Sequence, residues 1–386
     1  MASQSKAASE NNEKSLIIKD RLAFIPLILM MVFFAGTWSF PYFYHITEKY
    51  NSLIIFAALS LLLLIKGDII KRLKNRDTAL ILTGLAVVTA FINLLIIGSN
   101  LGCILILADF LLVIYMGERV KLSRFQMKML EIFFFLMYAS WFFYDRAFSY
   151  NSNTGATYTV FTLFAALIVL SRLAEKNVLF GFFIVAAFLR TFTLILWHLA
   201  RGAFMALVFF IFFYFLFLFF DPAVHKKKYV FLSAFAVFGS LLFVWAYVSL
   251  SRTGFNAQMP FFYKNIFSGR EDIWAEIWEM LKTHLLTGIG SGYELRSFFE
   301  YNIHNAMYDI LAVHGIIVFA IAAFLIIKTL VNAGRHVTSD RSTHIASAAV
   351  FAIFFESFID MDLMWADYSP VLFLLLLEVF REKDRG

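Results

Sequence analysis

Long apolar stretches separated by short polar ones run through almost the whole chain. Twelve of them have the composition of membrane helices, each near or somewhat below the roughly 20 residues that a spanning helix needs. They lie at residues 22–44, 52–65, 78–98, 101–116, 129–144, 157–173, 178–196, 202–220, 229–250, 308–331, 343–359 and 367–380. This pattern predicts an all-α integral membrane protein with about twelve transmembrane helices.

The main interruption of the pattern is the polar stretch at residues 251–306, between the ninth and tenth apolar stretches. It is rich in charge, glycine and histidine. Irregular backbone at a membrane persists only where water or other protein satisfies its polar groups, so such a segment caps or lines a cavity. We therefore predict a long external loop at 251–306 that carries the active site.

The composition supports a single membrane domain. Hydrophobic residues make up 61% of the chain and charged residues 16%, whereas soluble domains are about half apolar and a quarter charged. We expect a disordered cytoplasmic tail at residues 1–21, a polytopic membrane domain at 22–380 and a short cytoplasmic tail at 381–386. No cleavable signal peptide is expected, and the single cysteine, Cys103, excludes a disulfide framework.

The basic residues predict the orientation of the helices. With both termini in the cytoplasm, most of the 33 Lys and Arg residues fall on cytoplasmic segments, as the positive-inside rule requires. The net charge of +6 is then explained by membrane orientation, and no nucleic acid partner is expected. Arg201 and Arg270 fall on the outer side, where this rule disfavours basic residues. Their presence there therefore calls for a chemical role.

Arg201 and Arg270 stand where helices are predicted to begin. Guanidinium groups bind phosphate oxygens two at a time, and a helix N-terminus also favours an anion. Together the two arginines can hold a diphosphate. The alternative is that they reach toward the membrane interface or pair with nearby carboxylates.

His304 and Asn305 lie where the loop returns to the membrane at the tenth stretch. A neutral histidine can accept a proton from a sugar hydroxyl as that oxygen attacks an anomeric carbon. A purely structural histidine remains the alternative. His314 is expected to lie inside the tenth span and is the weaker candidate.

Three carboxylates, Glu356, Asp360 and Asp362, lie near the outer end of the eleventh stretch. They either orient a base, bind a sugar or neutralise the arginines. The outer segments contain no HExxH motif, and Asp360-Met361-Asp362 is the nearest approach to an acidic metal-binding motif. We therefore expect metal-independent chemistry without a cofactor.

Two further patterns lie within the loop. Residues 271–286 are predicted to form an amphipathic helix at the membrane interface, with Trp274 and Trp278 at headgroup depth. The glycines that follow, Gly288, Gly290 and Gly292, permit a sharp turn and close approach of a ligand. No β-strand precedes them, which argues against a nucleotide-binding loop.

Four short motifs, taken in order, resemble one superfamily. They are Arg201-Gly202-Ala203 at the start of a span, Gly269-Arg270 with Trp274, the turn with Gly288, Gly290 and Gly292, and His304-Asn305 before the next span. Their order and spacing resemble the bacterial O-antigen ligases and the O-antigen or capsule polysaccharide polymerases. The resemblance covers roughly residues 200–320.

The resemblance implies a GT-C-like fold and an inverting, metal-independent glycosyl transfer at the outer face of the bacterial inner membrane. By matching positions, His304 and Arg270 are the candidate catalytic residues. The substrate-binding candidates are Arg201, Arg270, Asn305, Gly290 and Gly292. One departure is Ala200, where the family often has serine.

Three functions remain in competition. The first is a polymerase that joins polyprenyl-diphosphate-linked repeat units, with undecaprenyl diphosphate as the expected carrier. The second is a ligase that moves the finished glycan to a lipid core, as in lipopolysaccharide, or to another acceptor. The third is a glycolipid transporter, which would predict charged or broken helices near mid-membrane in two related halves. The expected partners are the glycan donor, a glycan or glycolipid acceptor, and membrane lipids.

Overall fold

A computed structural model of the chain describes residues 2–47, 50–98, 100–145, 150, 152–222, 224–255, 257–259, 262, 264–296, 303–337 and 340–381. Within these residues the regular structure is helical, apart from one antiparallel ladder between β1 (Gln258–Met259) and β2 (Lys264–Asn265). The helices, in chain order, are α1 (Ala2–Ser39), α2 (Pro41–Thr47), α3 (Asn51–Lys66), α4 (Ile69–Lys74), α5 (Thr78–Ile97), α6 (Leu101–Arg119), α7 (Arg124–Phe143), α8 (Ser152–Lys176), α9 (Leu179–Trp197), α10 (Arg201–Phe219), α11 (Lys226–Ser251), α12 (Arg270–Leu281), α13 (Ala306–Ala333), α14 (Arg341–Glu356) and α15 (Ser369–Val379).

Each of the twelve apolar stretches corresponds to one helix: α1, α3, α5 to α11, α13, α14 and α15. Within the described residues, eight of these are long and apolar enough to cross a membrane, and α3 and α15 are shorter apolar helices. The eight are α1 from Ile17 onward, α5, α6, α8, α9, α10, α11 and α13. The prediction of an all-α, multi-pass membrane protein is confirmed.

The ends of the chain are only partly described. The helix α1 begins at Ala2, within the stretch for which a disordered tail is expected, and its apolar part starts at Ile17. Of the predicted C-terminal tail, residues 382–386 lie outside the described residues.

Local capping explains why two neighbouring apolar stretches form separate helices. The helix α5 is capped at its C-terminal end by Gly98, whose positive φ of 77° suits a residue without a side chain. The next helix, α6, begins after Asn100, whose side-chain oxygen accepts a hydrogen bond of 2.9 Å from the backbone of Gly102. A C-terminal glycine followed by an N-terminal asparagine is a stop and a start signal in close succession.

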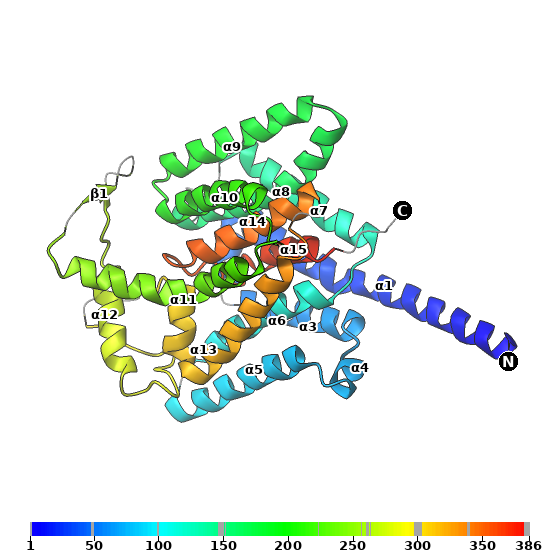
Figure 1. The fold of residues 1–386 in the computed structure, drawn as a ribbon, viewed down its shortest axis with the longest axis horizontal. Coiled ribbons are helices and arrows are strands. Elements are labelled where there is room, and N and C mark those ends of the chain that lie inside the picture. Colours follow the sequence, from blue (N-terminus) through cyan, green and yellow to red (C-terminus); the bar gives the residue numbers. More distant parts are fainter. Residues whose placement is uncertain are drawn as a thin grey trace.

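The centre of the bundle is the pair α14 and α15, which other helices surround (Figure 1). The helix α14 packs against α8, α10 and α15 and is buried from Ser342 to Glu356. Aromatic rings fill the contact with α10, where the ring centroids of Phe213 and Phe355 lie 4.7 Å apart. Such complete burial fixes the position of the segment that follows α14.

Several helix ends meet at one end of this central helix. The helix α10 begins beside the point where α14 ends. A β-carbon added at Gly202, the second residue of α10, would lie 3.1 Å from the side chain of Glu356, the last residue of α14. The helix α13 begins there as well, since the backbone of Ala306 donates to the carbonyl of Ser357 at 3.2 Å. This meeting point positions the candidate site.

Candidate active site

A single carboxylate connects the two candidate catalytic residues. One oxygen of Asp360 lies 3.4 Å from Nη2 of Arg270, and the other lies 3.2 Å from Nδ1 of His304. The three side chains are 20 to 27% exposed, so they are held by protein and still reachable by a substrate. The structure therefore brings Arg270 and His304 together on one carboxylate.

Arg270 is placed by the residue one turn later in α12. Trp274 is 1% exposed, and its ring packs against that of Tyr247 in α11 at a centroid distance of 5.1 Å. Its indole nitrogen donates to the carbonyl of Ile303 at 2.5 Å. Residues four apart lie on the same helix face, so anchoring Trp274 also fixes the direction of Arg270.

The expected position of this amphipathic helix needs a correction. We predicted residues 271–286 at the membrane interface with both tryptophans at headgroup depth. The helix ends at Leu281, Trp274 is buried against α11, and only Trp278 is exposed, at 46%. The helix does have an apolar face, but a neighbouring protein helix covers much of it.

His304 is held between the loop and the start of α13. Its φ is 52°, in the left-handed region that a residue with a β-carbon seldom adopts, so its neighbours must fix it there. The next residue, Asn305, is fully buried. Its side-chain oxygen accepts from the backbone of Tyr308 and from the hydroxyl of Ser240, both at 2.8 Å. Its amide nitrogen donates to the carbonyl of Phe358 at 2.8 Å.

These bonds give Asn305 a structural task. It caps α13 and ties the start of that helix to α11 and to the segment after α14, which is the segment that carries Asp360. The side chain lies beside the site, but its hydrogen bonds go to protein. It therefore sets the distance between His304 and Asp360.

Arg201 completes the basic side of the site. It begins α10, and its Nη1 donates to the carbonyl of Asn265 in β2 at 2.7 Å. Ala200, the departure from the family pattern, provides no side-chain cap for α10.

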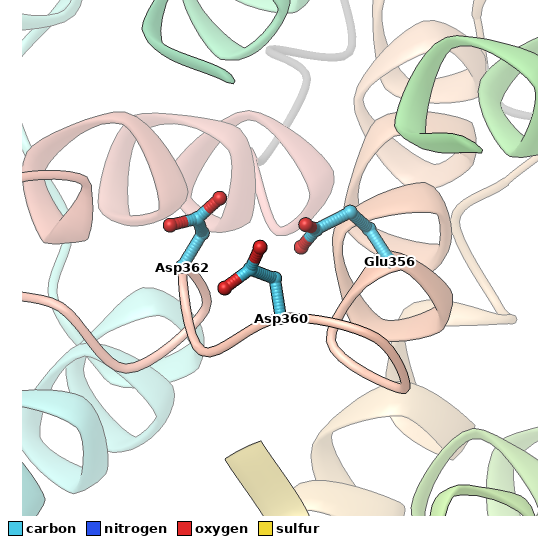
Figure 2. A group of neighbouring side chains, drawn as sticks. All are labelled: Glu356, Asp360 and Asp362. Carbon is cyan, nitrogen blue, oxygen red and sulfur yellow. The ribbon is translucent and has the colours of Figure 1, made fainter. Parts of the chain in front are cut away.

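Three carboxylates form a cluster beside Arg270. Single oxygens of Glu356, Asp360 and Asp362 all lie within 4.8 Å of one another, and Figure 2 shows the three groups turned toward one another. Glu356 is fully buried, and neither of its carboxylate oxygens has a hydrogen-bond partner within the described part of the chain. Repulsion between carboxylates this close favours keeping a proton on at least one of them.

The two aspartates of the cluster have opposite pKa shifts. Burial favours the neutral acid of Asp360, but the hydrogen bond from His304 and the charge of Arg270 outweigh it and lower its pKa. Burial, and then the negative charge of Asp360, raise the pKa of Asp362 well above its ordinary value. At neutral pH Asp360 is thus the ionised partner that His304 and Arg270 need.

The glycine of the Arg201-Gly202-Ala203 motif is explained by this cluster. A β-carbon at position 202 would lie 3.1 Å from Oε1 of Glu356 and 3.5 Å from Oδ2 of Asp360. Glycine therefore lets the first turn of α10 approach the carboxylates and brings Arg201 next to them.

By donor type and spacing, the same three carboxylates could also hold a cation. In the sequence all three residues are candidates, but only Asp360 and Asp362 stand close enough to form a motif. Glu356 lies beside them because it is the last residue of α14, directly before the segment that carries Asp360 and Asp362. Against a metal ion stands Arg270, whose guanidinium already faces Asp360.

The predicted substrate-binding glycines lie elsewhere. Backbone N–H groups of Ile289 and Gly290 donate to the carbonyls of Ala312 and Val313 in α13, at 2.7 and 3.2 Å. Val313 is eight residues beyond Asn305, or roughly 12 Å along the helix. Gly292 is exposed, and nothing lies within 4 Å of the position of an added β-carbon. The structure does not bring Gly290 or Gly292 into contact with Arg270 and His304.

The glycine turn instead fills a break in α13. At Gly315 the backbone leaves the helical conformation, with φ 81° and ψ 173°. The N–H of Ile316 donates to the carbonyl of Leu285, while Ala312 accepts from Ile289. The turn thereby replaces hydrogen bonds that an unbroken helix would make internally.

Two other histidines are placed by the structure. His314 is buried beside the break in α13, where its carbonyl accepts from the side chain of Asn93 at 2.9 Å, away from the cluster. His198 is buried three residues before Arg201, and its Nε2 lies 2.8 Å from Asp145. The sequence gives no local signal for this pair, because 53 residues separate its members.

A helical membrane domain thus holds two arginines, a histidine and an ionised aspartate at one end. Residues 186–323 match the family model described as O-antigen ligase, and this segment includes Arg201, Arg270 and His304. The matched segment contains all four motifs from which the resemblance to O-antigen ligases and polymerases was drawn. No curated protein and no solved structure matches the chain. The match indicates that this segment is similar to enzymes that process glycans at a membrane.

Proposed function

We propose that this protein polymerises oligosaccharide repeat units carried on a polyprenyl diphosphate, at the outer face of the bacterial inner membrane. The observation that carries the proposal is the bridge from Arg270 through Asp360 to His304. It joins a group that binds a leaving phosphate to a group that accepts a proton, and glycosyl transfer needs both.

Arg201 and Arg270 act on the donor. A diphosphate is already a good leaving group, and its negative charge grows as the bond to the sugar breaks. Two fixed guanidinium groups at the ends of α10 and α12 stabilise that charge through paired hydrogen bonds. This also gives the outward arginines a reason to exist against the positive-inside trend.

His304 acts on the acceptor. When Nδ1–H donates to Asp360, the neutral ring has an in-plane lone pair on Nε2, and this nitrogen can accept a proton. The ionised Asp360 holds this tautomer and stabilises the imidazolium that forms. A bond then forms from the acceptor oxygen to the anomeric carbon, the bond from that carbon to the diphosphate oxygen breaks, and the hydroxyl proton moves to His304.

The proposal includes inversion at the anomeric carbon and independence from metal ions. A single displacement inverts the centre, because the acceptor attacks opposite the departing diphosphate. The two arginines supply the positive charge that a metal ion would otherwise provide.

A ligase is the second candidate, and the description of the matched family favours it. It uses the same donor and the same groups, and differs only in the acceptor hydroxyl. Two structural features fit the transport alternative, namely the break at Gly315 and the buried Asp109 in α6, whose oxygens lack hydrogen-bond partners in the described residues. Neither feature belongs to the cluster around Asp360.

The decisive experiment is transfer by purified protein in detergent, with polyprenyl-diphosphate-linked repeat units as the only substrate and with a chelator present. A ladder of longer lipid-linked glycans is expected. Product only after addition of a core-lipid acceptor would establish the ligase, and a requirement for added metal would overturn the metal-free mechanism.

Variants assign the activity to the site. Arg270→Gln and His304→Ala should abolish the ladder while the protein still inserts into membranes. Arg252→Gln is the matched control, because Arg252 is an exposed arginine at the end of α11 outside the cluster. Robust transfer by either site variant would remove that residue from the mechanism.

A further inference from the structure

A large cavity lies at the end of α14 opposite to the cluster. Its volume is about 790 Å³. It includes Arg341, the first residue of α14, whereas Glu356 is the last, so the two sites are roughly 22 Å apart along the helix axis. The elements that surround the cavity are the ends of α8 and α15, the link between α6 and α7, and the starts of α7 and α14.

The lining of this cavity is strongly basic. It carries the side chains of Lys121, Arg124, Lys128, Arg172, Lys176, Arg341 and Arg381, against the acidic Glu175, Asp340 and Glu378. The arginines 172 and 381 are each bonded to both Glu131 and Glu378, so those four charges balance. The excess of positive charge therefore comes from the other lining residues.

Three of those residues make no ion pair with any residue that the structure describes: Lys128, Lys176 and Arg341. They come from α7, α8 and α14, three different helices that converge on one cavity. Basic residues that serve only to orient membrane spans need to lie on the cytoplasmic side of the membrane. They have no reason to gather around one cavity. Their convergence points to an anionic ligand.

An apolar groove continues from the basic cavity. It has a volume of about 330 Å³ and lies among α8, α9, α10 and α14, where Phe188, Ile211 and Phe215 contribute to its wall. Arg341 lines both spaces, and the adjacent residues Ser171 and Arg172 line one each. A charged compartment that joins an apolar one at a shared arginine matches a molecule with a phosphate headgroup and a hydrocarbon chain.

We propose that this composite site binds an anionic membrane lipid, with its phosphate among Lys128, Lys176 and Arg341 and one chain in the groove along Ile211. Basic pockets between helices are suited to acidic lipid headgroups on the cytoplasmic side, the side that the positive-inside rule gives to this end of the bundle. The site lies at the opposite end from the proposed transfer chemistry and is separate from it.

The test is lipid retention by the full-length protein in native mass spectrometry. The probes are dioleoyl phosphatidylglycerol, dioleoyl phosphatidylcholine with the same chains, and inorganic diphosphate. The cavity variant combines Lys128→Gln, Lys176→Gln and Arg341→Gln. Its control combines Lys71→Gln, Lys74→Gln and Lys227→Gln, which removes the same charge from exposed lysines outside the cavity.

Wild type and the control variant should retain phosphatidylglycerol over phosphatidylcholine, and the cavity variant should lose at least about tenfold in apparent affinity. Ile211→Trp, which narrows the groove without adding charge, should also weaken retention of the lipid. Equal loss in the control variant would mean general surface electrostatics and overturn the proposal. Binding of diphosphate with no effect of Ile211→Trp would show a site for a soluble anion and overturn the lipid assignment.

Discussion

Oδ1 of Asp360 lies 3.2 Å from Nδ1 of His304, although 56 residues separate them in the chain. The other oxygen of the same carboxylate faces Arg270. One side chain thus sets the orientation of two groups with different tasks, and a change at Asp360 should affect both.

Replacing Asp360 with asparagine should lower the transfer rate by roughly ten- to a hundredfold, since a hydrogen bond to a charged group contributes about 1.5–3 kcal/mol. The amide cannot stabilise the imidazolium of His304 or balance Arg270. Initial rates and the pH profile of transfer provide the measurement. Asp272→Asn, at an exposed carboxylate of α12, is the control. An unchanged pH profile in Asp360→Asn would remove Asp360 from the proton-transfer step.

The pKa of Asp362 predicts a dependence of stability on pH. Because burial and the charge of Asp360 raise this pKa, the folded protein holds the proton more tightly than the unfolded chain does. The resulting stability is fully present below the unfolded pKa, near 3.8, and is lost as pH rises toward the folded pKa.

Asp362→Asn imitates the protonated acid and should flatten this loss. Its melting temperature should fall less than that of wild type between acidic and mildly alkaline pH. Thermal unfolding in detergent across that range provides the measurement. Parallel curves for the variant and wild type would show that Asp362 binds its proton equally in both states.

Gly202→Ala should disturb the cluster from the side of α10. Its methyl group would approach Oε1 of Glu356 to 3.1 Å, and Glu356 is fully buried, so the contact must be relieved by a shift of the Glu356 side chain or of α10. We expect a loss of about 1–3 kcal/mol, as for other overpacked sites, and reduced transfer.

The matched control for that variant is Gly84→Ala in α5, where nothing lies within 4 Å of the added carbon. Alanine favours a helix, so this change should leave stability equal or raise it by about 0.4–1 kcal/mol. Both variants are compared by thermal unfolding and by initial transfer rate. Equal behaviour of the two would contradict the close approach at Gly202.

The glycine turn offers a test that separates folding from substrate binding. Gly288 has a φ of 77°, and a β-carbon there would lie 2.4 Å from the carbonyl oxygen of Val313, so Gly288→Ala should markedly reduce the amount of folded protein. Gly292→Ala meets open space and should leave both stability and the KM for the donor unchanged. A raised KM in Gly292→Ala would restore the turn as part of the substrate site.

The helices could be predicted from the sequence because a long apolar stretch in a bilayer has few alternatives to a helix. Arg201, Arg270 and His304 could be singled out for a similar reason, since each stands at a predicted helix end inside a recognisable motif. The position of Asp360 could not be predicted. It depends on how the segment after α14 packs against α10 and α13, and no local pattern encodes that packing.

The tryptophans of α12 show the same limit. Their spacing places Trp274 and Trp278 on one helix face, and that part of the prediction is correct. Which of them is covered depends on α11, whose Phe243 and Tyr247 contact Trp274. The glycines are similar, because a turn was predictable but its partner, the break at Gly315, lies in a different helix.

The break in α13 has a consequence for how the loop can vary in length. The segment 285–290 makes backbone hydrogen bonds to the residues on either side of the break, so its length cannot change without the loss of those bonds. The exposed Gly292 lies just past it. Insertions are tolerated where backbone is exposed and not hydrogen-bonded, so an epitope or a fluorophore belongs after Gly292 and not before Gly290.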